Sequence, residues 1–148
     1  MRSLRGWFLV AAALFAGAVH AQQRVHFASQ DPAVELLGFW FAASVPASTA
    51  APTVVLLHGC GGTYNAKGEL SERTREYARL LNEHGLHALV VDSLMPRGEK
   101  EICTQRIGTR KVTQANRRLD ALAAVAWLAQ RAEVDVGRIG LMGWSNGG

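Results

Sequence analysis

Residues 138–148 read Arg-Ile-Gly-Leu-Met-Gly-Trp-Ser-Asn-Gly-Gly. Residues 138–142 have the apolar character of a strand that is buried inside a parallel sheet. The G-x-S-x-G spacing from Gly143 to Gly147 follows at once, and it is typical of a sharp strand-to-helix turn that exposes the hydroxyl of Ser145. Glycines suit such a turn because they carry no Cβ atoms that would collide across it. An incidental serine in an ordinary turn is the alternative, and the position directly after a strand argues against it.

Upstream of this turn, strands and helices alternate. Two apolar runs predict buried strands at residues 53–57 and 86–91, and two periodic segments predict helices at residues 71–83 and 109–131. Gly85 suits the position that ends the first helix. The buried positions expected are Thr74, Ala78 and Leu81 on the first helix, and Val112, Ala115, Leu119, Leu122 and Ala126 on the second. Shorter strands are expected at residues 25–29 and 34–42.

This alternation of elements predicts an α/β fold. Each strand-helix-strand unit makes a right-handed crossover, so the sheet is mainly parallel and helices cover both of its faces. The expected architecture is a three-layer sandwich. In such sheets ligands bind at the carboxyl ends of the strands, where the serine turn also lies.

A glycine-rich segment, His58-Gly59-Cys60-Gly61-Gly62, follows the strand predicted at 53–57. A serine that attacks a carbonyl carbon needs N–H donors aimed at the oxygen on which charge develops. We expect the backbone N–H groups of Cys60 and Asn146 to be these donors and Ser145 to be the nucleophile. The segment lacks the lysine spacing of a phosphate-binding loop. His58 is expected to tie the loop backbone together, and Asp92 to organise the loop after the next strand.

These motifs resemble those of the α/β-hydrolases, and within that fold the dienelactone hydrolase family of exported bacterial proteins. The resemblance runs from about residue 53 to residue 148 and includes the segments 57–62, 91–93, 96–98, 138–140 and 143–148. It implies a hydrolase that works through an acyl-enzyme, with Ser145 at the nucleophile position. Dienelactone hydrolases in the strict sense use cysteine there, so the serine favours a broader esterase or lactonase.

The resemblance also implies an Asp or Glu and then a His after the serine, in that order. The histidines at 20, 26, 58, 84 and 87 all precede Ser145, and none occupies the base position. We therefore interpret residues 22–148 as the N-terminal part of a single hydrolase domain that is truncated after the turn. Purified alone, this piece is expected to aggregate or to lack esterase activity; a soluble, cooperatively folded and active product would contradict the interpretation.

Other side chains also lie near the predicted site. Cys60 and Cys103 both fall in loops at the same sheet edge, so a disulfide between them is expected, with two free thiols as the alternative. Arg97 is a candidate contact for a substrate carboxylate, or else it pairs with acidic neighbours such as Glu99 and Glu101.

Trp144, beside the serine, either packs against the turn or lines an acyl pocket.

The first 21 residues predict a signal peptide rather than a folded element. Arg2 and Arg5 precede an apolar run at residues 7–19, and a cleavage site of small residues ends at Ala21. The run is shorter than the roughly 20 residues that span a membrane, which favours export over an anchor. We expect an exported protein, periplasmic or secreted, that does not stay in the membrane after cleavage.

Composition limits the remaining classes of function. The chain has 148 residues, is 49% hydrophobic and 19% charged, and has a net charge of +4, without a basic cluster that would mark a nucleic-acid groove. Two cysteines are too few for a structural zinc site, and no metal or cofactor is expected. The leading hypothesis is a serine hydrolase of small ester or lactone substrates. The alternatives are a serine peptidase of the prolyl-oligopeptidase type and a non-catalytic binding domain on the same scaffold.

Overall fold

The computed structural model describes residues 22–148 except Ala33 and Ala47, so the predicted signal peptide lies outside the described residues. The described elements are β1 (Gln23–Ala28), β2 (Glu35–Phe41), β3 (Ala51–Leu57), α1 (Glu72–Glu83), β4 (His87–Asp92), α2 (Gln114–Leu128) and β5 (Val134–Gly143), with short 3₁₀ turns at Met95–Arg97 and Ser145–Gly147. In this part of the chain no helix has the length and apolar character required to cross a membrane.

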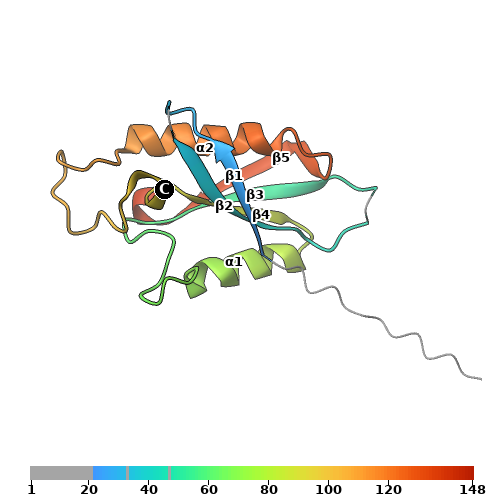
Figure 1. Cartoon of the computed structure of the whole chain (residues 1–148). Coiled ribbons are helices and arrows are strands. Elements are labelled where there is room, and N and C mark those ends of the chain that lie inside the picture. The colour runs from blue at the N-terminus through green and yellow to red at the C-terminus, as the bar shows by residue number, and fades with distance from the viewer. Residues whose placement is uncertain (1–21, 33, 47) are drawn as a thin grey trace, which may run out of the picture.

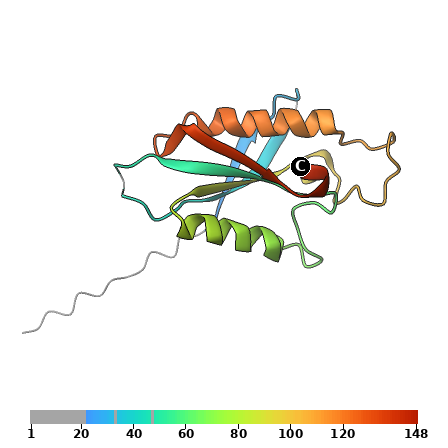
Figure 2. The ribbon, with the colours of Figure 1, turned by 180° about the vertical axis from the view of Figure 1, so that it is seen from behind.

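The strands form one sheet in the order β1-β2-β4-β3-β5. β3 lies between β4 and β5 and pairs with both in parallel, whereas β2 pairs antiparallel with β1 and β4. α2 covers one face of the sheet and α1 the other, as Figures 1 and 2 show from opposite sides. The predicted three-layer α/β sandwich is therefore confirmed.

The register of the parallel strands positions the candidate site. Leu57 of β3 pairs with Val91 of β4 and with Gly143 of β5, so the three strands end at the same level. The segments that follow them therefore emerge side by side at one edge of the sheet.

Helix α1 begins and ends where the sequence predicts. The Ser71 side chain accepts a hydrogen bond from the Thr74 backbone N–H, which satisfies one of the free donors of the first turn. Gly85 follows the helix with a φ of 75°, a conformation that favours glycine. Thr74 and Ala78 are buried, while Leu81 is only partly buried. The inward face of α1 thus packs on the sheet with small side chains.

Helix α2 differs from the prediction in its start and in its buried face. It begins after Thr113, whose side chain forms a capping box with Asn116, so residues 109–112 belong to a loop. Of the predicted buried face, Ala115, Leu122 and Ala126 are exposed, and Leu119 is only partly buried. The buried residues of α2 are instead Arg117, Asp120, Ala121, Ala123, Ala124 and Leu128. The prediction counted apolar residues only, and it missed the charged Arg117 and Asp120, which lie on the inward face and are buried there.

Val112, predicted for the buried face of α2, is buried in the preceding loop. It packs there in a small cluster with Leu94 and Ile102. The apolar periodicity therefore identified a core residue and placed it in the wrong element.

Strand β5 also differs from the prediction. Its residues were expected to be buried on both faces, but most of them are exposed or partly buried, and Leu141 is 58% exposed. Among the described strands β5 pairs only with β3, so it is an edge strand here. An apolar run reports the composition of a strand and not the number of its neighbours.

Arg97 connects three distant segments through its guanidinium group. It donates to both carboxylate oxygens of Asp120 at 2.8 and 2.9 Å, to Asp31 at 2.9 Å and to the carbonyl oxygen of Ser93 at 2.8 Å. Its side chain is 9% exposed and that of Asp120 is fully buried. Of the two interpretations of Arg97, the structure has the pairing with acidic residues, but the partners are Asp31 and Asp120 rather than Glu99 and Glu101. These partners occupy the terminal nitrogens that a substrate carboxylate would need.

Replacing Arg97 by methionine is expected to lower the free energy of unfolding by about 3–5 kcal/mol, because it leaves the buried carboxylate of Asp120 without its counter-charge. Arg79→Met is the matched control, since Arg79 pairs with Glu76 in an exposed position and its loss is expected to change little. Urea unfolding at pH 7 measures both effects. Equal losses in the two variants would contradict a structural role for the buried network.

Candidate active site

The turn after β5 holds Ser145 in a strained backbone conformation. Its φ is 53°, and among the described residues it is the single non-glycine residue with a positive φ. Such strain persists only where the surrounding structure fixes it, and it recurs at functional sites. The turn closes with hydrogen bonds from the Gly147 N–H to the Trp144 carbonyl oxygen at 2.8 Å and from the Gly148 N–H to the Ser145 carbonyl oxygen at 3.1 Å.

The two glycines of the G-x-S-x-G motif are required by contact between backbones. A Cβ atom at Gly143 would overlap the carbonyl group of Gly147, and one at Gly147 would overlap the carbonyl oxygens of Leu57 and His58. The turn therefore packs directly on the end of β3 with no side chain between them. This is the sharp strand-to-helix turn that the motif predicts.

The glycine-rich loop after β3 lies against this turn. A Cβ atom placed on Gly59 would be 3.2 Å from the carbonyl oxygen of Trp144 and 3.7 Å from the Cβ atom of Ser145. Ser145 is exposed. It lines a cavity of about 370 Å³ together with His58, Gly59, Cys60, Gly61, Gly62, Ser71, Arg73, Thr74 and Trp144. The structure thus brings Ser145 and the predicted donor loop to one cavity. Asn146, the other predicted donor, lines a separate cavity with Arg117 and Gly143.

His58 fixes the peptide group that carries the Cys60 N–H. Its Nε2 accepts a hydrogen bond from the Ser93 N–H at 3.2 Å, so the proton of the ring sits on Nδ1, which donates to the Gly59 carbonyl oxygen at 2.7 Å. In a trans peptide the carbonyl of Gly59 and the N–H of Cys60 point in opposite directions. Holding the carbonyl against His58 therefore directs the Cys60 N–H away from the imidazole ring.

Burial keeps this imidazole neutral. His58 is 4% exposed, and its desolvation, with a smaller contribution from the nearby Arg117 cation, lowers its pKa from 6.5 to about 4. Both ring nitrogens are engaged with the backbone, so His58 is a structural residue of the loop and does not serve as a base for Ser145.

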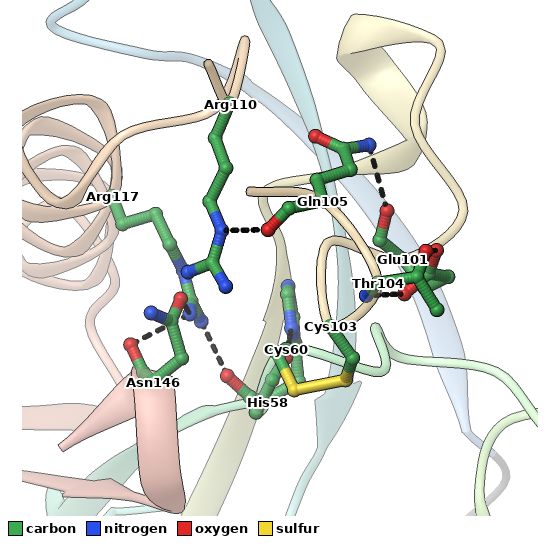
Figure 3. Close-up of a disulfide and its surroundings, with 10 residues drawn as sticks. His58, Cys60, Glu101, Cys103, Thr104, Gln105, Arg110, Arg117 and Asn146 are labelled. Atoms are coloured by element: carbon green, nitrogen blue, oxygen red, sulfur yellow. Dashed lines mark hydrogen bonds between the residues drawn. A yellow bond between two sulfur atoms is a disulfide. The ribbon is translucent and has the colours of Figure 1, made fainter. Parts of the chain in front are cut away.

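A disulfide fastens a second loop to the glycine-rich loop. Cys60 and Cys103 are bonded across a sequence separation of 43, with their Cα atoms 4.9 Å apart. Figure 3 shows this bridge. The Ile102 N–H donates to the Cys60 carbonyl oxygen at 2.8 Å, next to the bridge. Gly62, with a φ of 81°, passes so close to the Lys100 carbonyl that a Cβ atom would overlap it. Residues 100–103 therefore form a rim along one side of the Cys60 segment.

Arg117 of α2 reaches both sides of the site, and the sequence did not single it out. Its guanidinium donates to the Asn146 carbonyl oxygen at 2.8 Å, to Asn146 Oδ1 at 2.7 Å and to the His58 carbonyl oxygen (Figure 3). The side chain is 5% exposed. An arginine on an amphipathic helix is ordinarily taken as a solvent-facing residue, so no local signal could have revealed this role.

Two other residues of this edge have structural contacts. The Trp144 ring packs on Tyr77 of α1 in an edge arrangement with the ring centroids 4.9 Å apart, and Trp144 also lines the cavity of Ser145. Asp92 accepts hydrogen bonds from the N–H groups of Leu94 and Met95 at 3.0 and 3.1 Å, which shapes the loop after β4. Its burial raises the pKa of its carboxyl group.

The neutral imidazole of His58 gives a stability that depends on pH. Because the folded pKa is about 4 and the ordinary value is 6.5, the unfolded chain takes up the proton first as pH falls. The free energy of unfolding is therefore expected to fall by about 1–2 kcal/mol between pH 7 and pH 5 through His58 alone. His58→Asn removes this contribution, so urea unfolding should show a smaller difference between wild type and variant at pH 5 than at pH 7. The same difference at both pH values would contradict the assignment.

Comparison with known proteins places this architecture in a family. The family model described as "Dienelactone hydrolase family" matches residues 41–148. Among curated proteins, none matches the chain at a significant level.

Similar solved structures include a dienelactone hydrolase from Anabaena variabilis ATCC 29413, with a TM-score of 0.64 and 23% identity over 86% of this chain and 53% of that one. A dienelactone hydrolase-like promiscuous phosphotriesterase from metagenomic libraries has a TM-score of 0.63 and 21% identity over 86% of this chain and 50% of that one. Dipeptidyl peptidase 4 of Porphyromonas gingivalis has a TM-score of 0.61 and 23% identity over 86% of this chain and 18% of that one.

The chain thus spans about half the length of the first two structures. At these identities the likeness establishes the fold, and the family model, which matches most of the sequence, establishes the membership. The chain belongs to the dienelactone hydrolase family.

Proposed function

We propose that this protein is a serine hydrolase of ester or lactone bonds that works through an acyl-enzyme. The observation that carries the proposal is the strained, exposed Ser145, which lines one cavity with the glycine-rich loop. The serine replaces the cysteine that dienelactone hydrolases in the strict sense carry, which favours a broader esterase or lactonase activity. The substrate class is a small molecule with a carbonyl ester.

In the proposed reaction, Ser145 Oγ attacks the carbonyl carbon, and the carbonyl oxygen becomes negatively charged. In this proposal the N–H groups of Cys60 and Asn146 donate hydrogen bonds to that oxygen, and donors that are fixed before the reaction lower the barrier because they need no reorganisation. Collapse of the intermediate breaks the ester C–O bond, and the base returns the proton taken from Ser145 to the leaving oxygen, which departs as the alcohol. Water then attacks the acyl-enzyme and releases the acid.

The attack needs a base that takes the proton of the Ser145 hydroxyl, because a protonated serine is a poor nucleophile at neutral pH. Among the described histidines, His58 lines the cavity of Ser145, and both of its ring nitrogens are occupied. We therefore propose that the base, and the carboxylate that orients it, belong to a longer chain, and that residues 22–148 alone are inactive. The aligned part of this chain covers 53% and 50% of the first two similar structures, which supports this part of the proposal.

A serine peptidase is the second candidate. The chain shares its fold with the dipeptidyl peptidase 4 structure, in which the matching region is 18% of the chain. A peptidase cleaves an amide with the same nucleophile and donors, so the site described here does not separate the two activities. Comparison of p-nitrophenyl ester and dipeptidyl p-nitroanilide hydrolysis by the full-length protein does separate them.

Export is also part of the proposal. A disulfide between Cys60 and Cys103 persists in an oxidising compartment, which agrees with the signal peptide predicted at residues 1–21. Protein recovered from the periplasm is expected to show no reactive thiol in a non-reducing mass measurement after alkylation. Two alkylated cysteines would contradict both the bridge in the mature protein and the argument for export that it supports.

Labelling by a fluorophosphonate tests the nucleophile. In the full-length protein Ser145 is expected to form a covalent adduct, which peptide mass spectrometry locates. Ser145→Ala should abolish the adduct. It should also lower the rate of ester hydrolysis by at least a factor of about 1,000. Ser44→Ala is the matched control, because Ser44 is exposed in a loop outside the cavity and its loss should change neither result. Labelling of a different residue, or hydrolysis that survives Ser145→Ala, would overturn the proposal.

A further inference from the structure

We infer that Arg117 is a positioning residue that sets the distance between the two predicted oxyanion donors. It holds the loop that supplies the Cys60 N–H and the turn that supplies the Asn146 N–H with a single guanidinium group. We call these contacts of Arg117 with the loop and the turn the Arg117 clamp. The clamp follows from the geometry, whereas its effect on catalysis rests on the proposed function.

The contacts of Arg117 reach two segments that are far apart in the sequence. One terminal nitrogen donates to the carbonyl oxygen and the side-chain oxygen of Asn146, at 2.8 and 2.7 Å. The other donates to the carbonyl oxygen of His58 (Figure 3). Gln114, one turn earlier on α2, also donates to the Asn146 carbonyl oxygen at 3.1 Å. The helix thus holds the turn at two points, and Arg117 alone bridges from the turn to the glycine-rich loop among the described residues.

The chemistry of these acceptors is unusual for a buried cation. The side chain of Arg117 is 5% exposed, yet among the described residues its hydrogen-bond acceptors are two carbonyl oxygens and one amide oxygen rather than a carboxylate. Asp120, one turn further along α2, is engaged by Arg97. Burial of a charge without a direct ion pair is costly. A position that serves only packing would be filled at lower cost by an apolar side chain.

Only a planar fork of donors can make this set of contacts. The acceptors lie on two segments, so one group must donate in two directions at once, as guanidinium does. The ammonium group of a lysine is a compact charge with a shorter reach, and it would keep one of the two sides. Arg117→Lys therefore separates the bridge from the positive charge.

Arg117 acts from behind the site. It does not line the cavity that holds Ser145 and Cys60, and it lines instead a separate cavity with Gly143, Asn146 and Gly147. It is therefore placed to orient the donors without touching a substrate. Loosening this clamp should reduce the hydrogen bonds made in the transition state more than the binding of the ground state, because the donors match the developing oxyanion.

The test compares Arg117→Lys and Arg117→Ala with Arg118→Ala in the full-length protein. Arg118 is the matched control, an exposed arginine on the same helix. With p-nitrophenyl acetate, both Arg117 variants are expected to lose about 10- to 100-fold in kcat with less than a threefold change in KM. The lysine variant should not rescue activity, and Arg118→Ala should retain the wild-type kcat. An unchanged kcat in Arg117→Lys, or a loss confined to KM, would overturn the inference.

A second readout is independent of catalysis. Amide hydrogen exchange in residues 58–62 and 145–148 is expected to become at least tenfold faster in both Arg117 variants, while the strands β3 and β4 keep wild-type protection. Unchanged exchange in these two segments would overturn the clamp whatever the activity. If wild type shows no hydrolysis that depends on Ser145, the proposed function fails, and accelerated exchange in both segments would still support the clamp.

Discussion

The site depends on one close approach of two backbones. The turn after β5 lies so near the end of β3 that the carbonyl oxygens of Leu57 and His58 occupy the space of a Cβ atom at Gly147. With no side chain between them, the backbone of the serine turn lies directly against the end of β3 and the start of the glycine-rich loop. The strain at Ser145 follows from the same constraint, because the chain must reverse within the few residues that clear β3.

Around this contact, polar side chains on the inward face of α2 connect the loops of the site by hydrogen bonds. Its inward face carries Arg117, which bonds to both sides of the site, and Asp120, which accepts hydrogen bonds from Arg97 and from the Ser29 hydroxyl at 2.6 Å. Asn116 extends the set by donating to Asp31 at 2.9 Å. The apolar core therefore supports the sheet, whereas buried hydrogen bonds set the relative positions of the loops at its edge. Polar networks of this kind favour one arrangement of the segments that they connect, and here the Nε atoms of Arg97 and Arg117 have no hydrogen-bond partner among the described residues.

The sequence was informative where a local rule governs the chain. The serine turn, the end of α1 at Gly85 and the order of the elements follow from glycine geometry, helix capping and periodicity, and the structure has each of them. The roles of Arg97 and Arg117 could not be read in this way, because their partners are brought near by the tertiary fold. The prediction of the buried face of α2 was wrong for the same reason. The exposure of the β5 side chains depends on which elements pack beside that strand. Long-range partners, and not local propensity, decide these features.

The common level at which β3, β4 and β5 end has a consequence for how the sequence can vary in length. Because Gly143 pairs with Leu57, the position of Ser145 is fixed relative to the end of β3. One inserted or deleted residue in β5 would shift the turn by about 3.3 Å along the strand. It would also move the side chains of β5 beyond that point to the opposite face of the sheet. The exposed segment at residues 106–109, by contrast, lies in a long loop outside the sheet. Among proteins with this fold, insertions and deletions should therefore be common in that loop and rare in β5.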